Sequence, residues 1–310
     1  MAKIIASHYE LGQKKESLED LCKLNSDWDY ERLLLKTGIK YRYVLDQDQT
    51  PEELSVKAGK ACIDKMENKY IDGIIYVSQS PSKPLPTRAC FLQDQLGIQR
   101  NSLAFDVNQG CSGFIYALSI ATSLIQNNCA TRIIIICADF YSKYISKNDR
   151  TSRPIFSDAA AAIVIEKSSL NQIGPFIFKT AGEGGDFLTV NKKEGKNKFY
   201  MDGPAVLKFS LGLVPEATYE LLDKSNNNIE GIDTFVFHQA SAIVLNKLQK
   251  KLNIPDQKWF NRIENLGNTV SATIPIAINI LQNEGKFSYS KKYLMMGFGV
   301  GLSVAGCIIS

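Results

Sequence analysis

The sequence predicts an α/β fold made of two similar halves. Stretches with the hydrophobic pattern of strands alternate along the chain with stretches that have the pattern of helices. The same alternation starts again after a polar stretch at residues 167–172. A chain of 310 residues is also long enough to bury a large core. We therefore predict a duplicated arrangement, with one half at residues 1–168 and the other at residues 169–310.

In the first half, a strand is expected at the amino terminus, and four apolar runs predict further strands. These runs are residues 71–78, 103–108, 132–138 and 160–166. Uninterrupted apolar runs are typical of sheets that are covered on both faces. Two helices are expected between them, at residues 52–68 and 112–126. The second has one apolar face, formed by Phe114, Leu118, Ala121 and Ile125.

The second half is predicted to repeat this pattern of helices and strands. Helices are expected at residues 204–223, 240–252 and 274–283, and strands at residues 232–237, 293–296 and 302–309. Two polar segments, residues 191–198 and 225–228, are rich in asparagine, and the first also in lysine and glycine. Both are expected to be solvated loops.

Composition excludes several classes of protein. Hydrophobic residues make up 45% of the chain and charged residues 22%, a balance that argues against disorder. No apolar run approaches 18 residues, so no membrane span is expected. The net charge of +4 is too small to indicate a nucleic acid partner.

The cysteines and histidines limit the chemistry further. Seven cysteines are scattered without a C-x-x-C pair, and the amino terminus turns polar too early for a secretory signal. Reduced thiols and a cytoplasmic location are therefore expected. The only histidines are His8 and His238, which nearly excludes a metal site built from several histidines.

Cys111 is the first candidate for a catalytic residue. It lies where the strand pattern of residues 103–108 gives way to the helix pattern, and Gly110 and Gly113 flank it. Unpaired amides and the positive end of the helix dipole should favour a thiolate there and lower the pKa of Cys111. Free cysteines are more often simple packing residues, so this position alone does not establish catalysis. It needs partners.

His238 and Asn268 are the candidate partners. His238 follows the predicted strand at residues 232–237, at the end where α/β sheets usually place their ligand crevices. Asn268 lies in the turn-rich stretch Gly267-Asn268-Thr269, before an apolar helix. Taken singly, a lone histidine is usually a core residue and Gly-Asn usually marks a loop. Together, a thiol, an imidazole and an amide suit thioester chemistry.

These motifs and three others resemble the β-ketoacyl-[acyl carrier protein] synthase III family of thiolase-fold condensing enzymes. The resemblance covers essentially the whole chain, and the joint order of the motifs is far more specific than any one of them. The matching stretches are residues 36–39 (KTGI), 106–118 around Cys111, 156–158 (FSD), 238–240 (HQA), 267–269 (GNT) and 297–301 (GFGVG).

The resemblance implies a thiolase-like, five-layered α-β-α-β-α fold and a homodimer. It also implies that Cys111 accepts an acyl group from acyl-CoA or acyl carrier protein. His238 and Asn268 would then assist its decarboxylative condensation with malonyl-acyl carrier protein, in fatty-acid or specialised acyl-chain biosynthesis. The main-chain amides of Cys111 and Val300 would form the oxyanion hole. No metal or redox cofactor is expected.

The resemblance also implies positions that bind the substrate around this centre. Arg150 matches a residue that contacts the adenine end of coenzyme A, and Lys36 would lie at the pantetheine mouth. The family often has a tryptophan that stacks on adenine. An ungapped match places Arg32 there, whereas a small insertion would make it Trp28. Leu85 stands where a phenylalanine commonly limits the acyl pocket.

A basic helix face is a candidate docking site for the acyl carrier protein. Lys247, Lys250 and Lys251 lie on one face of the predicted helix at residues 240–252, beside an apolar stripe with Val244 and Leu248. Most such lysines are merely solvated. The resemblance, however, places an acidic carrier protein at similar positions, and docking of this kind would be sensitive to salt.

Two other functions remain open at this point. The first is an acyltransferase of the same fold, which would pass the acyl group from Cys111 to a hydroxyl or an amine. It would need no enolate stabilisation, so the presence of both His238 and Asn268 counts against it. The second is a non-catalytic partner that only binds carrier protein, which would have no reason to keep the three residues. Thiolase itself is disfavoured, because no second cysteine stands in the glycine-rich motif.

Overall fold

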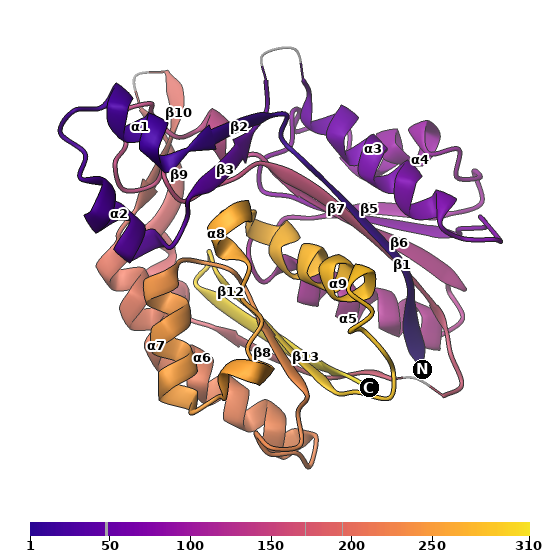
Figure 1. Cartoon of the computed structure of the whole chain (residues 1–310). Coiled ribbons are helices and arrows are strands. Elements are labelled where there is room, and N and C mark those ends of the chain that lie inside the picture. The colour runs from indigo at the N-terminus through magenta and orange to yellow at the C-terminus, as the bar shows by residue number, and fades with distance from the viewer. Residues whose placement is uncertain (47–48, 171, 194) are drawn as a thin grey trace.

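The chain folds into five layers, in which two β-sheets alternate with three layers of helices (Figure 1). This arrangement confirms the predicted fold class. The computed structural model describes residues 1–46, 49–170, 172–193 and 195–310. Sheets that are covered on both faces need apolar strands, which explains why the strand runs show so little polar alternation.

The first sheet has five strands, and all of them come from the first 167 residues. The order is β1 (Ala2–Leu11), β7 (Ala159–Lys167), β6 (Arg132–Asp139), β4 (Gly73–Val77) and β5 (Leu103–Val107). β4 is parallel to both β5 and β6, whereas β7 is antiparallel to β6 and β1. The isoleucine run of β6 is completely buried at the centre of this sheet.

The second sheet has four strands, and all of them come from residue 173 onwards. The order is β11 (Thr234–Phe237), β12 (Tyr293–Gly299), β13 (Ser303–Ile309) and β8 (Ile173–Thr180). β11 and β12 are parallel, and the other neighbours are antiparallel. β11 and β12 therefore end at the same edge of the sheet, and this edge carries the candidate site.

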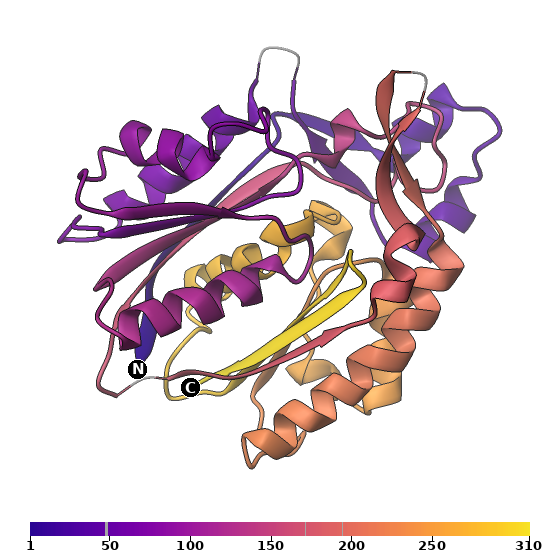
Figure 2. The same cartoon turned by 180° about the vertical axis from the view of Figure 1, so that it is seen from behind.

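Helices cover both sheets and fill the space between them. α3 (Pro51–Asp64) and α4 (Arg88–Gln95) pack on the outer face of the first sheet, and α6 (Gly203–Lys224) and α7 (Ala242–Leu252) cover the second. The middle layer consists of α5 (Gly113–Gln126) and α9 (Thr273–Asn283), which lie side by side between the sheets. This is plain in both views (Figures 1 and 2). Both middle helices are apolar almost all round, as a helix between two sheets must be.

Smaller elements surround the end of the molecule near the candidate site. They are β2 (Lys14–Ser17), α1 (Leu18–Leu24), α2 (Tyr30–Thr37), β3 (Tyr41–Val44) and α8 (Ile263–Leu266). β2 pairs with β3, and α2 packs against α7. At this contact Gly38 ends α2 with a left-handed backbone, and a β-carbon at Gly38 would lie 2.5 Å from the β-carbon of Ala242.

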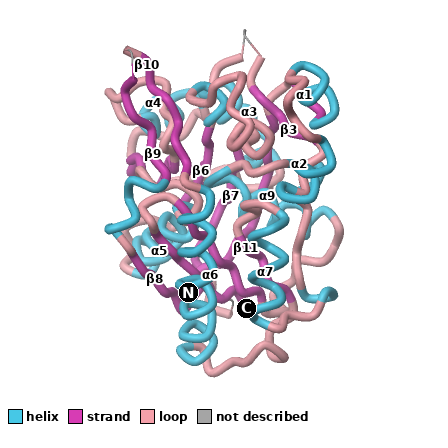
Figure 3. Tube along the Cα trace, turned by 90° about the vertical axis from the view of Figure 1, so that its left-hand side faces the viewer, coloured by secondary structure: helices cyan, strands magenta, loops and turns pink. Residues whose placement is uncertain are grey.

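The prediction of a solvated loop at residues 191–198 is wrong. This segment belongs to a hairpin of β9 (Leu188–Lys193) and β10 (Lys196–Met201), which Figure 3 shows as two neighbouring strands. The hairpin forms because Leu188 and Phe199 are buried in the core of the second half. The polar side chains of Asn191, Lys192, Asn197 and Lys198 are exposed on these strands. The other predicted elements are present, and the largest shift is at α3, which ends at Asp64.

Candidate active site

Cys111 lies in a tight turn between β5 and α5. The N–H of Gly113 donates to the carbonyl of Gly110 at 2.8 Å, and α5 starts directly afterwards. The turn packs against the end of β12, where a β-carbon at Gly299 would lie 2.8 Å from the Cys111 sulfur. Gly299 also has a φ of +156°, so this position admits only glycine. Close contact with Cys111 thus explains why a glycine stands at position 299 in the motif at residues 297–301.

The expectation of a lowered pKa for Cys111 is wrong for this structure. Burial, with the nearby charge of Asp139, raises the pKa of Cys111 to about 12. The main-chain amides of Val300 and Cys111 act in the opposite direction, because they hydrogen-bond the sulfur, but their effect is smaller. The resting group is therefore a thiol. At this position the loss of solvent outweighs the favourable effect of the helix terminus on the thiolate.

His238 follows β11 directly and is almost completely buried. Its main-chain N–H donates to the carbonyl of Met296 at 2.8 Å, and its ring packs edge-on against Phe298. The ring atom Nδ1 lies 2.8 Å from the hydroxyl of Thr273. Burial lowers the pKa of His238 to about 3, so the imidazole is neutral at ordinary pH.

The side chain of Asn268 is held in a single orientation. Its Oδ1 accepts a hydrogen bond from the N–H of Val270 at 2.9 Å, which fixes the positions of the amide oxygen and nitrogen. Nδ2 donates to the carbonyl of Ala240 at 3.3 Å and has a second proton for another acceptor. Val270 itself has a φ of +53°, which is unusual for a β-branched residue. Strain of this kind, at about 1–3 kcal/mol, is often kept at functional sites.

Two sets of contacts fix the Asn268 loop to the first half of the chain. The main chain of Asn268 donates to Ile155 at 2.9 Å and accepts from Ser157 at 2.8 Å. In addition, the buried carboxylate of Asp139 accepts from the Ser271 hydroxyl at 2.5 Å. Asp139 stands at the end of β6, so this hydrogen bond ties the two halves together beside the catalytic candidates.

One cavity of about 240 Å³ connects these groups. Cys111, His238, Asn268 and Val300 all line it, and Lys36 lies at the same cavity. The sequence-based grouping of these five residues is thus reproduced in space. Most of the remaining wall is apolar, with contributions from Tyr141, Ile155, Phe156, Leu188, Met201, Val206, Leu207 and Phe298. Such a wall excludes water and suits an acyl chain.

The structure does not bring every predicted residue to this cavity. Trp28 is 7% exposed and packs against Leu18, Leu21 and Leu33, so its ring cannot stack on a ligand, and that interpretation is wrong. Trp28 lies in the loop between α1 and α2 and is buried against the apolar residues of both helices.

Arg32, Arg150 and Leu85 also lie away from the cavity wall. Arg32 on α2 and Arg150 in the loop after β6 are both exposed. Leu85 is 80% exposed, between β4 and α4, and does not line the cavity of the chain. The expectation that Leu85 limits the length of the acyl pocket is therefore wrong for the single chain. Tyr141 and Phe156 instead fill part of the cavity wall, with their ring centroids 5.3 Å apart.

Three residues near the centre were not identified from the sequence. Thr273 contacts the histidine, Asp139 anchors the asparagine loop, and Tyr141 closes the cavity. Of these, only Asp139 carries a recognisable signal, because an acidic residue ends an otherwise apolar strand. Among the described residues, no group of three or more His, Cys, Asp or Glu side chains could hold a metal ion.

The buried His238 should make the stability of the protein depend on pH. Unfolded His238 titrates near its ordinary pKa of 6.5 and folded His238 near 3, so between these values the unfolded state binds more protons. The contribution of His238 to the free energy of unfolding therefore decreases as the pH is lowered, by about 2 kcal/mol from pH 7 to pH 5. Urea titrations of the native protein and of His238→Gln should differ by this pH-dependent amount. A constant difference across that range would contradict the buried, neutral imidazole.

The fold and this cavity define the class of protein, a condensing acyltransferase of the thiolase fold. Models of 3-oxoacyl-[acyl-carrier-protein] synthase III and of its C-terminal part match residues 105–182 and 222–310. The chain is 33% identical to β-ketoacyl-[acyl-carrier-protein] synthase III of Clostridium perfringens, with 96% of this chain and 94% of the relative covered. It therefore belongs to the 3-oxoacyl-[acyl-carrier-protein] synthase III family.

Similar solved structures agree with this assignment. The 3-oxoacyl-[acyl-carrier-protein] synthase III of Aquifex aeolicus superposes with a TM-score of 0.93 at 30% identity, covering 100% of this chain and 99% of that chain. The priming β-ketosynthase of the R1128 polyketide pathway superposes with a TM-score of 0.94 at 25% identity, covering 100% and 96%. Within the described residues, no helix is both long and apolar enough to cross a bilayer.

Proposed function

We propose that this enzyme joins an acyl group, carried on Cys111, to a malonyl unit on acyl carrier protein, with loss of carbon dioxide. The observation that supports this most is the single, mostly apolar cavity that is lined by a thiol, a neutral imidazole and an oriented amide. Measuring the carbon dioxide released when acylated enzyme meets malonyl-acyl carrier protein tests the proposal.

In the first step, the Cys111 sulfur attacks the carbonyl carbon of an acyl thioester. A new carbon–sulfur bond forms, the original thioester bond breaks, and the Cys111 proton leaves with the departing thiol. The negative charge that develops on the carbonyl oxygen needs donors that are already in place. The amides of Cys111 and Val300 hydrogen-bond the sulfur in the resting enzyme and are thus near this oxygen. Such a donor is worth about 3–4 kcal/mol in the transition state.

In the second step, the malonyl carboxylate leaves as carbon dioxide, and the remaining enolate attacks the acyl group on Cys111. His238 and Asn268 stabilise the enolate oxygen as neutral hydrogen-bond donors. Asn268 has one amide proton available for this purpose, because Nδ2 carries two and donates only one of them, to Ala240. His238 donates from Nε2 in the tautomer in which the Thr273 hydroxyl gives its single proton to Nδ1, 2.8 Å away, instead of to the carbonyl of Val270, 3.1 Å away. The carbon–sulfur bond to Cys111 breaks as the new carbon–carbon bond forms, so the products are a 3-oxoacyl chain on the carrier and a Cys111 thiolate. This thiolate takes up one proton from solvent to restore the resting thiol.

This chemistry needs no metal or redox cofactor, because the thioester and the departing carbon dioxide supply its driving force. Acyl-CoA or acyl carrier protein would deliver the primer past Lys36, with Arg32 and Arg150 as exposed cations for a coenzyme A tail. The seven cysteines are free thiols, which suits the cytoplasm. Fatty-acid initiation and specialised acyl-chain synthesis would both use this reaction.

We also infer that the enzyme works as a homodimer. β5 is the edge strand of the first sheet and offers unpaired backbone groups to a second copy. Leu103, Phe105 and Val107 along this edge are only half-buried in the single chain. Analytical ultracentrifugation that gives the mass of a single chain, at the protein concentration used for activity assays, would contradict this inference.

The exposed face of α7 should recruit the carrier protein. The ammonium groups of Lys247 and Lys250 are exposed and make no hydrogen bond or ion pair with another described residue, whereas that of Lys251 donates to the carbonyl of Leu211. Ser241 and Ile243, at the start of the same helix, line the active-site cavity. A carrier docked on α7 would therefore lie beside the cavity entrance.

Reversing both charges, with Lys247→Glu and Lys250→Glu, should raise the KM for malonyl-acyl carrier protein about tenfold at low salt. The effect should shrink as salt is added, because exposed charges are screened. Turnover with a malonyl thioester that lacks the protein should stay unchanged. Lys57→Glu with Lys60→Glu, on the remote helix α3, is the matched control. Equal losses in both double variants would contradict docking on α7.

A further inference from the structure

A second cavity, of about 540 Å³, lies outside the active site and is strongly polar. Four cationic side chains line it, namely Lys14, Arg42, Lys147 and Arg153. Only two carboxylates, Glu16 and Asp46, line it with them. A third carboxylate, that of Asp158, lies behind the wall, where Ser142 and the N–H of Leu45 donate to it. The wall keeps an excess of positive charge even when Asp158 is counted.

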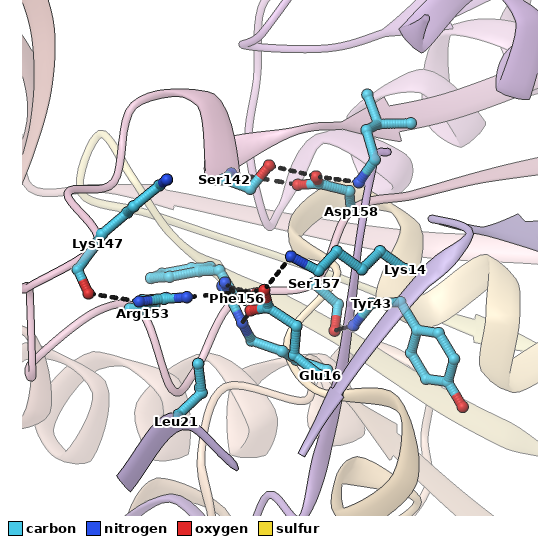
Figure 4. Close-up of polar contacts among 12 residues, drawn as sticks. Lys14, Glu16, Leu21, Tyr43, Ser142, Lys147, Arg153, Phe156, Ser157 and Asp158 are labelled. Atoms are coloured by element: carbon cyan, nitrogen blue, oxygen red, sulfur yellow. Dashed lines mark hydrogen bonds and ion pairs between the residues drawn. The ribbon is translucent and has the colours of Figure 1, made fainter. Parts of the chain in front are cut away.

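Three of these cations share Glu16 as their partner. Arg42 donates to it at 2.6 and 3.0 Å, Lys14 lies 3.1 Å away, and Arg153 lies 3.6 Å away. Figure 4 shows Lys14 and Arg153 reaching the carboxylate from different sides. Although burial opposes the change, these cations lower the pKa of Glu16. One carboxylate cannot balance three cations, and both guanidinium groups are largely shielded from water, since the side chains of Arg42 and Arg153 are 6% and 12% exposed.

The cations also have donors to spare. Each guanidinium carries five N–H groups. Arg153 uses one, to the carbonyl of Lys147 at 2.6 Å, besides its long contact with Glu16. Arg42 uses three, to Glu16 and to the carbonyl of Phe156. The ammonium of Lys147 makes no hydrogen bond or ion pair with any other residue that the structure describes.

We propose that this cavity binds a small phosphorylated molecule. Paired guanidinium groups with nearby ammonium groups are the usual recognition chemistry for phosphate, because they combine charge with several directed donors. The cavity is much larger than a phosphate ion, and Leu24, Val44, Leu45 and Ile145 give it an apolar side. An organic group attached to the phosphate would pack there.

This phosphate site is separate from the active-site cavity but shares a wall with it. Tyr141, Ile155 and Phe156 line the active site, while Ser142, Ile145 and Arg153 line the phosphate site. Arg42 contacts the shared wall directly, because it donates to the carbonyl of Phe156 at 3.1 Å. Phe156 is in turn bridged to Asn268. Arg42 is thus two contacts away from a catalytic candidate.

Titration calorimetry of the full-length protein with pyrophosphate and with adenosine monophosphate tests the proposal. We expect binding of at least one probe with a dissociation constant of about 1 mM or tighter. Lys147→Gln and Arg153→Gln should each weaken it at least about tenfold, as the loss of a charge-assisted hydrogen bond does. Lys147 is exposed, so its variant should fold normally even if the Arg153 variant does not. Tighter binding of the nucleotide than of pyrophosphate would assign the apolar side to an organic group.

Lys15→Gln is the matched control. Lys15 is next to Lys14 on β2, but its ammonium lies over the ring of Tyr41, 3.7 Å from the centroid, and it does not line the cavity. Its loss should leave the affinity unchanged within about twofold. The absence of binding by both probes, an equal loss in Lys15→Gln, or displacement of the bound probe by saturating coenzyme A would overturn the proposal. These measurements do not depend on catalysis, so they stand apart from the proposed condensation.

Discussion

Replacing Cys111 by alanine should abolish the acyl-enzyme and lower the rate of condensation by about a thousandfold or more. Among the described residues that line the active-site cavity, Cys111 is the only cysteine, and its sulfur accepts hydrogen bonds from the proposed oxyanion amides. Intact-protein mass spectrometry after incubation with an acyl thioester gives a direct reading. The native chain should gain one acyl mass and the variant none.

Cys90 and Cys129 provide the matched controls for this experiment. Both are exposed thiols far from any assigned role, and replacing either by alanine should leave the acyl mass in place. An acyl group that still appears on Cys111→Ala at the native rate would remove Cys111 as the nucleophile. Because burial raises the pKa of Cys111 to about 12, loading should also become faster as the pH rises across the neutral range.

His238→Ala and Asn268→Ala should separate the two halves of the reaction. Both variants should still acquire the acyl group, since neither side chain is needed to form the bond to sulfur. Their condensation with malonyl-acyl carrier protein should fall about a hundredfold or more, the usual loss when one donor to a developing oxyanion is removed. Rapid-quench measurements of acyl loading and of product formation distinguish the two steps.

His8→Ala is the natural control for the histidine variant, because His8 and His238 are the only histidines of the chain. His8 lies on β1, where it contacts Glu10, and should be dispensable for both steps. If His238→Ala lost acyl loading as severely as condensation, the imidazole would be acting on Cys111 itself. The assigned division of labour would then be incorrect.

The fold could be predicted from the sequence because its strands are buried on both faces and its middle helices are apolar. The run at Ile133–Ile136 and the apolar face of α5 were sufficient to place these elements. The catalytic candidates were also predictable, since Cys111 and His238 each follow a strand and Asn268 lies in a turn before a helix. Hydrophobic periodicity carries this information directly.

Features that depend on tertiary packing could not be predicted in this way. Trp28 is equally consistent with a core residue and a stacking residue until its neighbours in α1 and α2 are known. The pKa of Cys111 depends on how completely the second half covers the turn, which no local pattern records. The hairpin at β9 and β10 was missed because its two buried residues are separated by a polar tip. Thr273 gives no signal at all, since its role comes only from the position of the His238 ring.

The most direct test of the proposed reaction is to count carbon dioxide against acyl groups. Enzyme loaded with an acyl group on Cys111 would be mixed with malonyl-acyl carrier protein labelled at the free carboxyl carbon. We predict that one labelled carbon dioxide is released for each acyl group that leaves Cys111, with a 3-oxoacyl chain on the carrier. Acyl groups that leave Cys111 for a hydroxyl or an amine, without release of labelled carbon dioxide, would contradict decarboxylative condensation.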